Sequence, residues 1–467
     1  MLVFNASIET FKNAMIGKKV AVIGLGVSNI PAIDFLDRCG AVITACDRTD
    51  EDKMDGNVLK KLKSTCDALY LGDDYLDHLD GQDIILKSPG IIPVPPQILQ
   101  AQKNGAVLTS EMEIFMSLCP CTMVGITGSD GKTTTTTLIY EILKHAGYNC
   151  HIGGNIGTPL IGKLEEIDSD DMVILELSSF QLMNMQVSPQ IAVITNITPN
   201  HLDHHKDMTE YVEAKAEIFK HQDKTGRLIV NRDNAITASF AGKQNGKIEF
   251  FSRKYNECEA HMDDGWLCCC GQKIVRAEDI RIKGWHNVEN YLAAICAVRQ
   301  FVSVEDIAEV AKNFGGVEHR MEFVRSVGSV EFYNDSIGSS PTRTIAGLVA
   351  HEGKIVLIAG GYDKNLDYGE LGEVIAKRVS HLVLIGATAD KIEKAVIGAS
   401  KGGRRIPIDR ERTLDGAVQT AYRAARRLNG DKISVILSPA SASFDMFKNF
   451  MVRGNEFKRI VNSIEND

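Results

Sequence analysis

Short runs of β-branched and apolar residues alternate with amphipathic stretches along the whole chain. The first run, residues 19–24 (KVAVIG), predicts a strand, and residues 29–38 predict the helix that follows it. A second strand is expected at residues 41–47. This alternation is typical of parallel sheets covered by helices, so the fold class that we expect is α/β.

The alternation restarts twice, and each restart indicates a new domain. A strand at residues 122–127 leads into a glycine-rich loop and a helix at residues 132–145, and another strand begins near residue 329. Because 467 residues are too many for one core, we place domain boundaries near residues 117 and 317. The polar stretch 242–271 is interpreted as a hairpin-like surface excursion of the middle domain.

Composition narrows the classes of function. The net charge of −9 argues against a general nucleic-acid binder, because phosphate backbones are held by basic surfaces. No apolar run approaches the roughly 18 residues that a membrane helix needs, and the first residues lack the pattern of a secretory signal. The 11 cysteines do not have zinc-site spacing, which favours reduced thiols. We therefore expect a cytoplasmic protein without membrane insertion.

The glycine-rich loop carries the strongest chemical signal. It reads GITGSDGKTT over residues 125–134. Glycines let backbone N–H groups close around phosphate oxygens, and the helix N-terminus adds a favourable dipole. Lys132 would neutralise the β- and γ-phosphates, and the hydroxyl of Thr133 or Thr134 could bind Mg²⁺. The spacing is one residue longer than the strict G-x-x-x-x-G-K-[ST] pattern, but the strand–loop–helix context predicts an ATP site. Its expected ligands are Gly128, Ser129, Asp130, Gly131, Lys132, Thr133 and Thr134.

This loop resembles the T-G-x-x-G-K-[ST] loop of the Mur ligases and folylpolyglutamate synthetases, which couple ATP to amide formation. Asp130 stands where that family usually has Asn. The resemblance extends from Gly24 to Phe457, with the motifs in the family's order. It implies a Rossmann-like UDP-substrate domain, a central ATPase-type domain with a P-loop and a parallel sheet, and a Rossmann-like amino-acid domain. These would span residues 1–117, 118–316 and 317–467.

A buried carboxylate and a lysine are the expected metal residues. Glu176 interrupts the apolar strand predicted at residues 173–177, where a carboxylate is costly unless paired or metal-bound. The residues after it match the ligase pattern E-x-S-S-F-Q-L. The resemblance implies that Glu176, His201 and Thr133 serve two Mg²⁺ ions, although His201 could also be a helix cap. It also implies that Lys215 is carbamylated by CO₂, which would make it an oxygen ligand for the metal.

Three later segments match nucleotide-binding segments of the family. Residues 286–294 match H-N-x-x-N-x-x-A-A, in which Asn290 would contact the nucleotide. Residues 319–322 match H-R-x-E, in which Arg320 would bring a cation to the phosphates. Asp335, in an N-D-S segment, would bind the nucleotide ribose or metal-linked water.

The end of the chain resembles the amino-acid site of the D-glutamate-adding Mur ligases. Residues 437–457 match L-S-P-A-x-A-S-x-D-x-F-x-x-F-x-x-R-G-x-x-F. The residues that would line a D-glutamate pocket are Lys364, Ser443, Phe444 and Phe450. These ligases carry N-D-S-K-A-T, whereas this chain has Ile337 for that Lys and Ser339 for that Thr. A glutamate carboxylate normally needs a cation, which Lys364 could supply, so the amino acid itself stays open.

The turn after the first strand resembles a dinucleotide fingerprint. Gly24 and Gly26 fit the pattern, but Asn29 occupies the place of the third glycine. A NAD-dependent dehydrogenase would use such a turn, and D-glutamate-adding ligases use the same architecture to hold UDP. The expected UDP-substrate ligands are Gly26, Val27, Ser28, Asp47, Arg48, Ser88, Gly90 and Asn155.

The resemblance implies a two-step reaction by a monomeric enzyme. The carboxylate of UDP-N-acetylmuramoyl-L-alanine would attack the γ-phosphate of ATP, and the amine of D-glutamate would attack the resulting acyl phosphate. Three alternatives remain: a relative that uses another amino acid or folate, a non-catalytic scaffold, and the dehydrogenase. A scaffold would be expected to lose Lys132, Glu176 or Lys215, and all three are present. A hydride-transfer enzyme has no need of a second phosphate loop.

Overall fold

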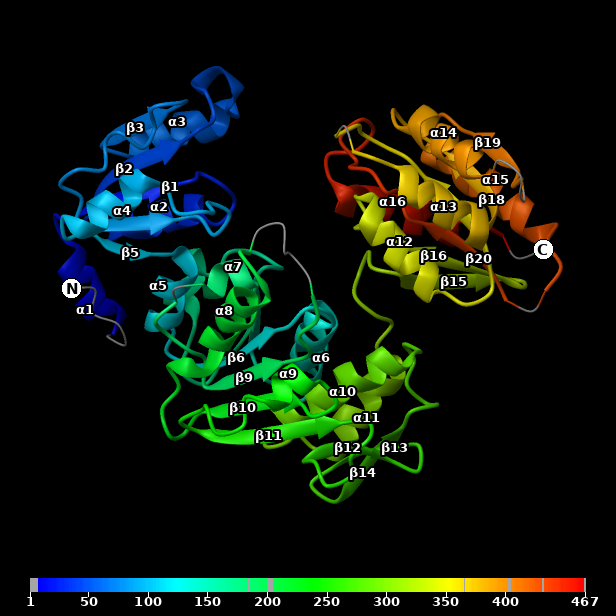
Figure 1. Ribbon diagram of the computed structural model, residues 1–467, viewed down its shortest axis with the longest axis horizontal. Coiled ribbons are helices and arrows are strands. Elements are labelled where there is room, and N and C mark those ends of the chain that lie inside the picture. Colours follow the sequence, from blue (N-terminus) through cyan, green and yellow to red (C-terminus); the bar gives the residue numbers. More distant parts are fainter. Residues whose placement is uncertain are drawn as a thin grey trace. The chain divides into compact units, whose positions relative to one another are not determined.

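The structure is a computed structural model that describes residues 7–183, 185–199, 205–364, 366–400, 405–430 and 432–465. Within these residues the chain forms three sheets flanked by helices, which confirms the expected α/β class (Figure 1). It divides into two compact units, Met1–Phe314 (unit 1) and Gly315–Asp467 (unit 2). The further division of unit 1 near residue 117 stays a prediction.

The first sheet of unit 1 has five parallel strands in the order β3-β2-β1-β4-β5 within the described residues. The strands are β1 (Lys19–Ile23), β2 (Val42–Asp47), β3 (Ala68–Leu71), β4 (Ile84–Lys87) and β5 (Val107–Thr109). The helices are α1 (Ile8–Met15), α2 (Asn29–Arg38), η1 (Glu51–Lys53), α3 (Gly56–Thr65), α4 (Pro96–Lys103) and α5 (Glu111–Leu118). The strand order reverses between β1 and β4, and in such sheets ligands bind at the carboxyl ends of the strands beside this reversal.

The second sheet of unit 1 has the order β14-β13-β12-β11-β10-β9-β6-β8-β7 in the described chain, parallel except at β12–β13 and β13–β14. Its strands are β6 (Thr122–Thr127), β7 (Cys150–Gly154), β8 (Met172–Glu176), β9 (Ile191–Ile194), β10 (Arg227–Asn231), β11 (Lys247–Ser252), β12 (Ala260–Asp263), β13 (Trp266–Cys269) and β14 (Gln272–Arg276). The helices are α6 (Lys132–His145), η2 (Ile161–Glu166), α7 (Ser179–Leu182), α8 (Met208–Lys220), α9 (Ala235–Ala238), α10 (Trp285–Val298) and α11 (Val304–Asn313). The carboxyl ends of β6, β9, β10 and β11 therefore meet at one edge of the sheet.

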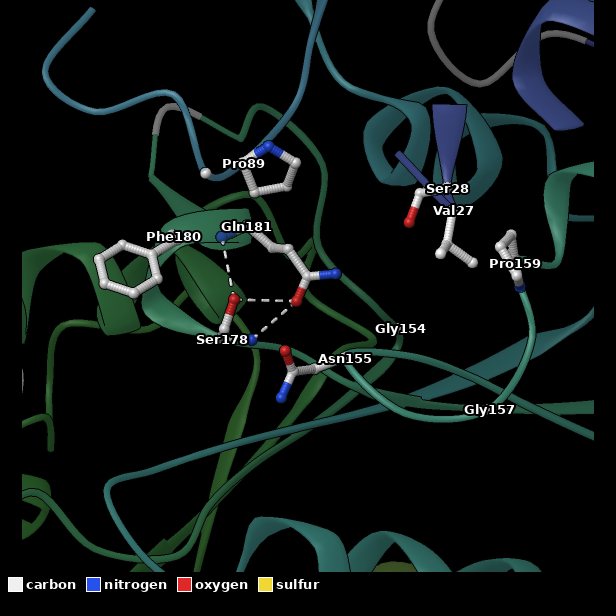
Figure 2. A pocket seen from close by; sticks show the side chains of 11 residues that line it. Val27, Ser28, Pro89, Gly154, Asn155, Gly157, Pro159, Ser178, Phe180 and Gln181 are labelled. Atoms are coloured by element: carbon white, nitrogen blue, oxygen red, sulfur yellow. Dashed lines mark hydrogen bonds between the residues drawn. The ribbon is translucent and has the colours of Figure 1, made fainter. Parts of the chain in front are cut away.

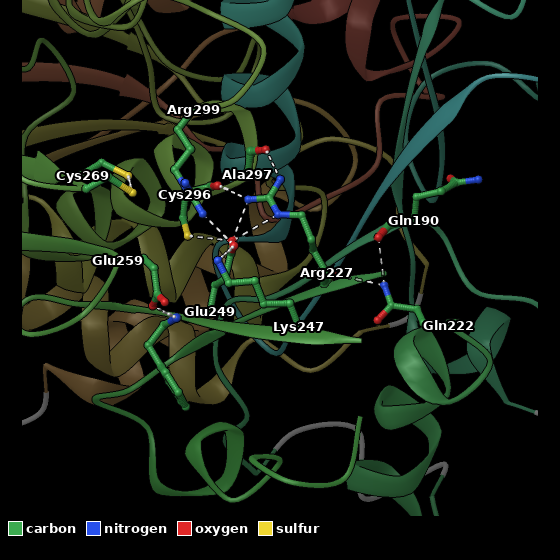
Figure 3. A network of polar contacts seen from close by, with 12 residues as sticks. Gln190, Gln222, Arg227, Lys247, Glu249, Glu259, Cys269, Cys296, Ala297 and Arg299 are labelled. Atoms are coloured by element: carbon green, nitrogen blue, oxygen red, sulfur yellow. Dashed lines mark hydrogen bonds and ion pairs between the residues drawn. The ribbon is translucent and has the colours of Figure 1, made fainter. Parts of the chain in front are cut away.

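The interpretation of residues 242–271 as a surface excursion is wrong for β11. This strand lies inside the sheet, between β10 and β12, and its Glu249 is 1% exposed because it is paired with Arg227 of β10 and with Arg299, which directly follows α10 (Figure 3). The hairpin expected in this stretch does exist, formed by the antiparallel strands β12 and β13.

Unit 2 holds the third sheet, with the order β15-β16-β20-β17-β18-β19 among its described residues. The β15–β16 pair is antiparallel and the others are parallel. The strands are β15 (Glu322–Val327), β16 (Val330–Asn334), β17 (Lys354–Ala359), β18 (Val379–Leu384), β19 (Ile408–Arg410) and β20 (Ile433–Leu437). The helices are α12 (Pro341–Ala350), α13 (Gly369–Arg378), α14 (Ala389–Ala399), α15 (Leu414–Arg426) and α16 (Phe450–Asn462). None of the described helices of either unit is long and apolar enough to cross a membrane.

Candidate active site

The phosphate loop runs from the end of β6 to the start of α6, as the sequence predicts. Two of its glycines have positive φ angles, 150° at Gly128 and 78° at Gly131, a region that favours glycine. A Cβ atom on Gly128 would lie 2.0 Å from Thr195 Oγ1, and one on Gly131 would lie 2.2 Å from Asn290 Oδ1. Both positions therefore require glycine, because the loop backbone packs directly against these two side chains.

Hydrogen bonds to neighbouring elements hold the loop in place. The N–H of Asp130 donates to Asn196 Oδ1 (3.0 Å), and the hydroxyl of Thr195 donates to the carbonyl of Asp130 (2.6 Å). The Ser129 hydroxyl lies 3.0 Å from the hydroxyl of Tyr211, on α8. The cradle at the N-terminus of the 14-residue helix α6 is thus shaped by the protein itself, which suits an anion site.

Two lysine ammonium groups converge on the same loop carbonyl. Lys132 Nζ donates to the carbonyls of Gly128 (2.9 Å) and Ser129 (2.8 Å), and Lys215 Nζ donates to that of Gly128 (2.7 Å). Lys215 is 1% exposed and lies 4.7 Å from the ring centroid of Tyr211. Burial, and next the like charge of Lys132, lower the pKa of Lys215 to about 7. No described carboxylate is within ion-pair distance of it, so the folded chain favours its neutral amine.

Glu176 is the last residue of β8 and is 1% exposed. Its Oε1 accepts a hydrogen bond from Asn155 Nδ2 (2.7 Å), whereas its buried Oε2 has no partner among the described residues. A buried carboxylate oxygen without a donor is costly, so a bound cation would compensate this atom. His201, the other predicted metal residue, lies outside the described residues. Across the described chain no three His, Cys, Asp or Glu side chains already form a metal-holding group.

A pocket of about 380 Å³ lies within unit 1 (Figure 2). It brings together Val27, Ser28 and Gly90, which follow strands of the first sheet, and Asn155, which follows β7 of the second. The side chain of Asn155 also donates a hydrogen bond to Glu176 Oε1. The part of the pocket that Asn155 lines is therefore next to the Glu176 carboxylate. The remaining lining residues are Pro89, Gly154, Gly157, Pro159, Ser178, Phe180 and Gln181.

Four predicted UDP-substrate residues are not among those that line this pocket, namely Gly26, Asp47, Arg48 and Ser88. The carboxylate of Asp47 instead accepts hydrogen bonds from the N–H groups of Leu25 (2.6 Å) and Thr49 (2.8 Å). The amide of Asn29, at the place of the missing glycine, donates to the carbonyls of Ile23 (3.2 Å) and Gly24 (2.8 Å). These bonds shape the turn after β1.

In unit 2 the N-D-S segment packs against the loop after β20. Asp335 is 5% exposed, and burial raises its pKa to about 6, although the Ser438 hydroxyl donates to its Oδ2 (2.5 Å). Arg453, which is 1% exposed, donates from Nη2 to the carbonyl of Ser336 (2.8 Å) and from Nη1 to that of Ser441 (3.1 Å). This guanidinium ties together the two loops that carry Asp335 and Ser443.

The other predicted amino-acid residues form two separate aromatic contacts. Phe444 is 59% exposed, packs edge-on to Tyr362 at 5.9 Å between centroids, and lies 5.6 Å from Lys364 Nζ. Phe450 opens α16 and lies edge-on to His319 at 5.9 Å. The structure therefore brings Lys364 and Phe444 together and places Phe450 beside the H-R-x-E segment.

Three family models match the chain in order. They are the Mur ligase MurD-like N-terminal domain at residues 18–110, the Mur ligase middle domain at 126–298 and the Mur ligase glutamate ligase domain at 319–439. A protein of Acetivibrio thermocellus named UDP-N-acetylmuramoylalanine--D-glutamate ligase is 53% identical over 99% of this chain and 100% of its own length. A Clostridium novyi protein of the same name is 50% identical over 97% of this chain and 98% of its own length. The chain belongs to the Mur ligase family.

Solved structures of Mur ligases share the fold. MurF from Acinetobacter baumannii has a TM-score of 0.56 at 18% identity and covers 82% of this chain and 92% of its own. MurC from Thermotoga maritima has a TM-score of 0.53 at 15% identity, over 95% and 99% of the two chains. At these identities the likeness concerns the fold alone.

Sequence reasoning assigned no role to four residues that support the Mur ligase site, although Ser178, Gln181 and Arg453 lie within the matched segments. Tyr211 contacts both Ser129 and Lys215, and its position four residues before Lys215 puts both on one helix face, a signal that was available. Gln181 and Ser178 line the pocket and form a capping box at the start of α7. Arg453 is buried on the apolar side of α16, which spacing alone does not reveal.

Proposed function

We propose that this Mur ligase joins D-glutamate to UDP-N-acetylmuramoyl-L-alanine with cleavage of ATP, as a cytoplasmic monomer that makes a peptidoglycan precursor. The observation that carries the proposal is the orphaned Oε2 of Glu176 beside a phosphate loop that holds two lysines. The shared name of relatives that are about half identical over almost the whole chain supports the choice of substrates.

The first step transfers phosphate to the alanyl carboxylate. Lys132 would bind the terminal phosphates, and the backbone N–H groups of the loop would orient them. The donor set fits Mg²⁺, a hard ion that prefers oxygen, because Glu176 offers an unused carboxylate oxygen and Thr133 a hydroxyl at the loop. When bound, Mg²⁺ neutralises phosphate charge; His201 is proposed as a further ligand from resemblance.

Lys215 is proposed to carry a carbamate. Only a neutral amine attacks CO₂, and a pKa of about 7 keeps a large fraction of this amine neutral at physiological pH. The neutral nitrogen forms a bond to the CO₂ carbon and releases one proton, so the amine becomes an anion with two carboxylate oxygen atoms. With ¹³C-labelled bicarbonate, a carbamate carbon signal should appear in the wild type and be absent from Lys215→Met.

The second step joins the amine of D-glutamate to the acyl phosphate and releases phosphate. We propose that Lys364, Ser443, Phe444 and Phe450 of unit 2 bind D-glutamate. Ile337 replaces the family's lysine, so Lys364 would supply the cation for the glutamate carboxylate. Lys364 Nζ lies beside the ring of Phe444. The roles proposed for Arg320 and Asp335, nucleotide contacts supplied by unit 2, rest on resemblance.

The deciding experiment measures phosphate release from ATP and Mg²⁺ with UDP-N-acetylmuramoyl-L-alanine and a panel of amino acids: D-glutamate, L-glutamate, D-aspartate, L-lysine and glycine. Release that requires both the nucleotide substrate and D-glutamate is expected. Release that requires another amino acid would support the ligase activity but exclude D-glutamate as its substrate. No release with any pair would overturn the proposal, and Lys132→Ala serves as the blank for contaminating ATPases.

A further inference from the structure

Two cysteine thiols lie side by side in the segment that leads from the first sheet of unit 1 to the second. Cys119 caps the C-terminal end of α5, and Cys121 directly precedes β6. Their Sγ atoms are 3.6 Å apart, and both thiols are free. The proposed reaction uses no thiol, so this pair is separate from the site described above.

The backbone holds the two thiols in this arrangement. Pro120 lies between them, and a proline fixes its own φ angle and disfavours a helical conformation for the residue before it. Cys119 accordingly has a φ of −62° and a ψ of 122°, and its N–H donates to the carbonyl of Phe115 (2.9 Å). On the other side, Cys121 continues into β6, which is paired with both β8 and β9. The two side chains are therefore brought together by a rigid stretch of chain.

The two thiols differ in exposure and in acidity. Cys121 is 4% exposed, whereas Cys119 is half-buried and precedes the exposed Pro120. The hydrogen bond from the Cys121 thiol lowers the pKa of Cys119, and the same bond, followed by burial, raises the pKa of Cys121. Because the thiolate is the nucleophile in exchange reactions, Cys119 is the better placed of the two to attack an oxidant from solution.

The separation of the two residues along the chain permits a disulfide bond. Cysteines joined by such a bond have Cα atoms about 4.4–6.8 Å apart, and residues two positions apart span at most about 7 Å. The thiols of Cys269 and Cys270 are also close, with Sγ atoms 3.9 Å apart. The Cα atoms of adjacent residues are only about 3.8 Å apart, however, which is too short for ordinary disulfide geometry.

We propose that Cys119 and Cys121 are a redox modification site, at which a low-molecular-weight disulfide such as oxidised glutathione links the two residues reversibly. The Cys119 thiolate attacks one sulfur of the oxidant, which forms a mixed disulfide and releases the first small thiol. Cys121 then gives up its proton and attacks Cys119 Sγ, which releases the second small thiol. Two protein thiols are thus oxidised to one disulfide, and the oxidant is reduced to two thiols that carry away the two protons.

Peptide mapping tests the bond directly, because trypsin releases both residues on one peptide. Residues 104–132 contain no lysine or arginine before Lys132, and Cys119 and Cys121 are their only cysteines. The native protein is incubated in glutathione buffers of increasing oxidised fraction, alkylated with iodoacetamide and digested. This peptide should increasingly escape alkylation and appear two hydrogens lighter than its reduced form. Dithiothreitol added before alkylation should reverse the change.

Two serine variants separate the attacking thiol from the second one. Cys121→Ser keeps the more exposed nucleophile, so its peptide should carry a glutathione adduct in place of the internal bond. Cys119→Ser leaves only the buried thiol, whose modification should be at least about tenfold slower. The matched control is the peptide of residues 255–273, in which no bond should form between Cys269 and Cys270.

The wild type alone can overturn the proposal, whether or not the variants fold. The site is excluded if peptide 104–132 remains fully alkylated in the most oxidising buffer. Equal rates of adduct formation in the two serine variants would exclude Cys119 as the attacking thiol. The mapping needs no substrate or nucleotide, so its outcome is independent of the phosphate-release experiment that tests the ligase.

Discussion

Two buried groups of charged side chains in the second sheet differ in how fully their charges are paired. The first, the Glu249 cluster, consists of Glu249, Arg227, Arg299 and Lys247 (Figure 3). Glu249 Oε2 accepts from Arg227 Nη2 and its Oε1 from Arg299 Nη2, both at 2.6 Å. Burial alone would raise the pKa of Glu249, but the hydrogen bonds and charges of its partners hold it below its ordinary value.

The second, the Glu176 cluster, consists of Glu176, Lys132 and Lys215 and is left incomplete. One carboxylate oxygen of Glu176 has no described hydrogen-bond partner, and both lysines donate to the carbonyl of Gly128. The orphaned oxygen of Glu176 costs free energy in the chain alone, and burial together with the charge of Lys132 disfavours the protonated form of Lys215. A bound cation would satisfy the orphaned oxygen of Glu176, and bound phosphates would bring negative charge next to Lys132.

The comparison teaches that buried charge by itself does not mark a site. The Glu249 cluster joins β10, β11 and α10, and both carboxylate oxygens of Glu249 are paired, although Arg299 Nε has no described partner. The Glu176 cluster adjoins the phosphate loop and a pocket, and one carboxylate oxygen of Glu176 has no partner among the described residues. A buried polar atom that lacks a hydrogen-bond partner and lies beside a pocket is therefore the better sign of a functional site.

Replacing the paired carboxylate should give the largest change in stability. Glu249→Gln is expected to lower the free energy of unfolding by about 3–5 kcal/mol, because two largely buried guanidinium groups lose their counter-charge. Urea denaturation of wild type and variant measures the difference. The matched variant Glu176→Gln should change it by less than about 1 kcal/mol. Equal losses in the two variants would remove the distinction between the clusters.

Replacing the unpaired carboxylate should instead remove activity. Glu176→Gln keeps an oxygen to accept from Asn155 but removes the anionic oxygen that would bind Mg²⁺. Its kcat for phosphate release should fall about 10²–10³-fold, equivalent to about 2.7–4 kcal/mol of transition-state stabilisation. Steady-state kinetics at saturating ATP measures the fall. A wild-type kcat in Glu176→Gln would show that Glu176 has a structural role and does not bind a catalytic metal ion.

Lys215 should make stability depend on pH in a defined window. The unfolded chain keeps this amine protonated up to its ordinary pKa of 10.5, whereas the folded chain releases the proton near pH 7. The unfolded state therefore binds more protons between these values, and stability should rise with pH there. Between pH 7.5 and 9 the gain should be on the order of 2 kcal/mol relative to Lys215→Met, measured by urea denaturation in CO₂-free buffer. A pH-independent difference would show that the folded chain keeps the ammonium.

Local patterns singled out Lys132 and Glu176 and missed the Glu249 cluster, whereas Lys215 was singled out by resemblance. The loop at residues 125–134 follows a strand and opens a helix within one short segment, so its spacing is visible in the sequence. Glu176 was visible because it interrupts an apolar run. The Glu249 cluster unites residues 22 and 50 positions apart, and only the sheet order brings them together.

The same reason explains the error over β11. The stretch 242–271 was interpreted as a surface excursion because it is polar as a whole, although β11 within it reads KIEFFS. Glu249 is nevertheless buried because Arg227 and Arg299 reach it from adjacent elements. Of the predicted UDP-substrate residues, Val27, Ser28, Gly90 and Asn155 line the pocket and Asp47 does not, a difference that the sequence does not reveal.

Within the Glu249 cluster, the exposed member should matter least. Lys247 Nζ lies 3.0 Å from Glu249 Oε1, but its side chain is 61% exposed, so water already solvates the ammonium. Lys247→Ala should change the free energy of unfolding by less than about 1 kcal/mol, and 0.5 M NaCl should shrink even that difference. Urea denaturation at low and high salt measures both. A loss that approached that of Glu249→Gln would mean that the two arginines do not balance the carboxylate alone, and that the cluster resembles the Glu176 cluster in needing an outside partner.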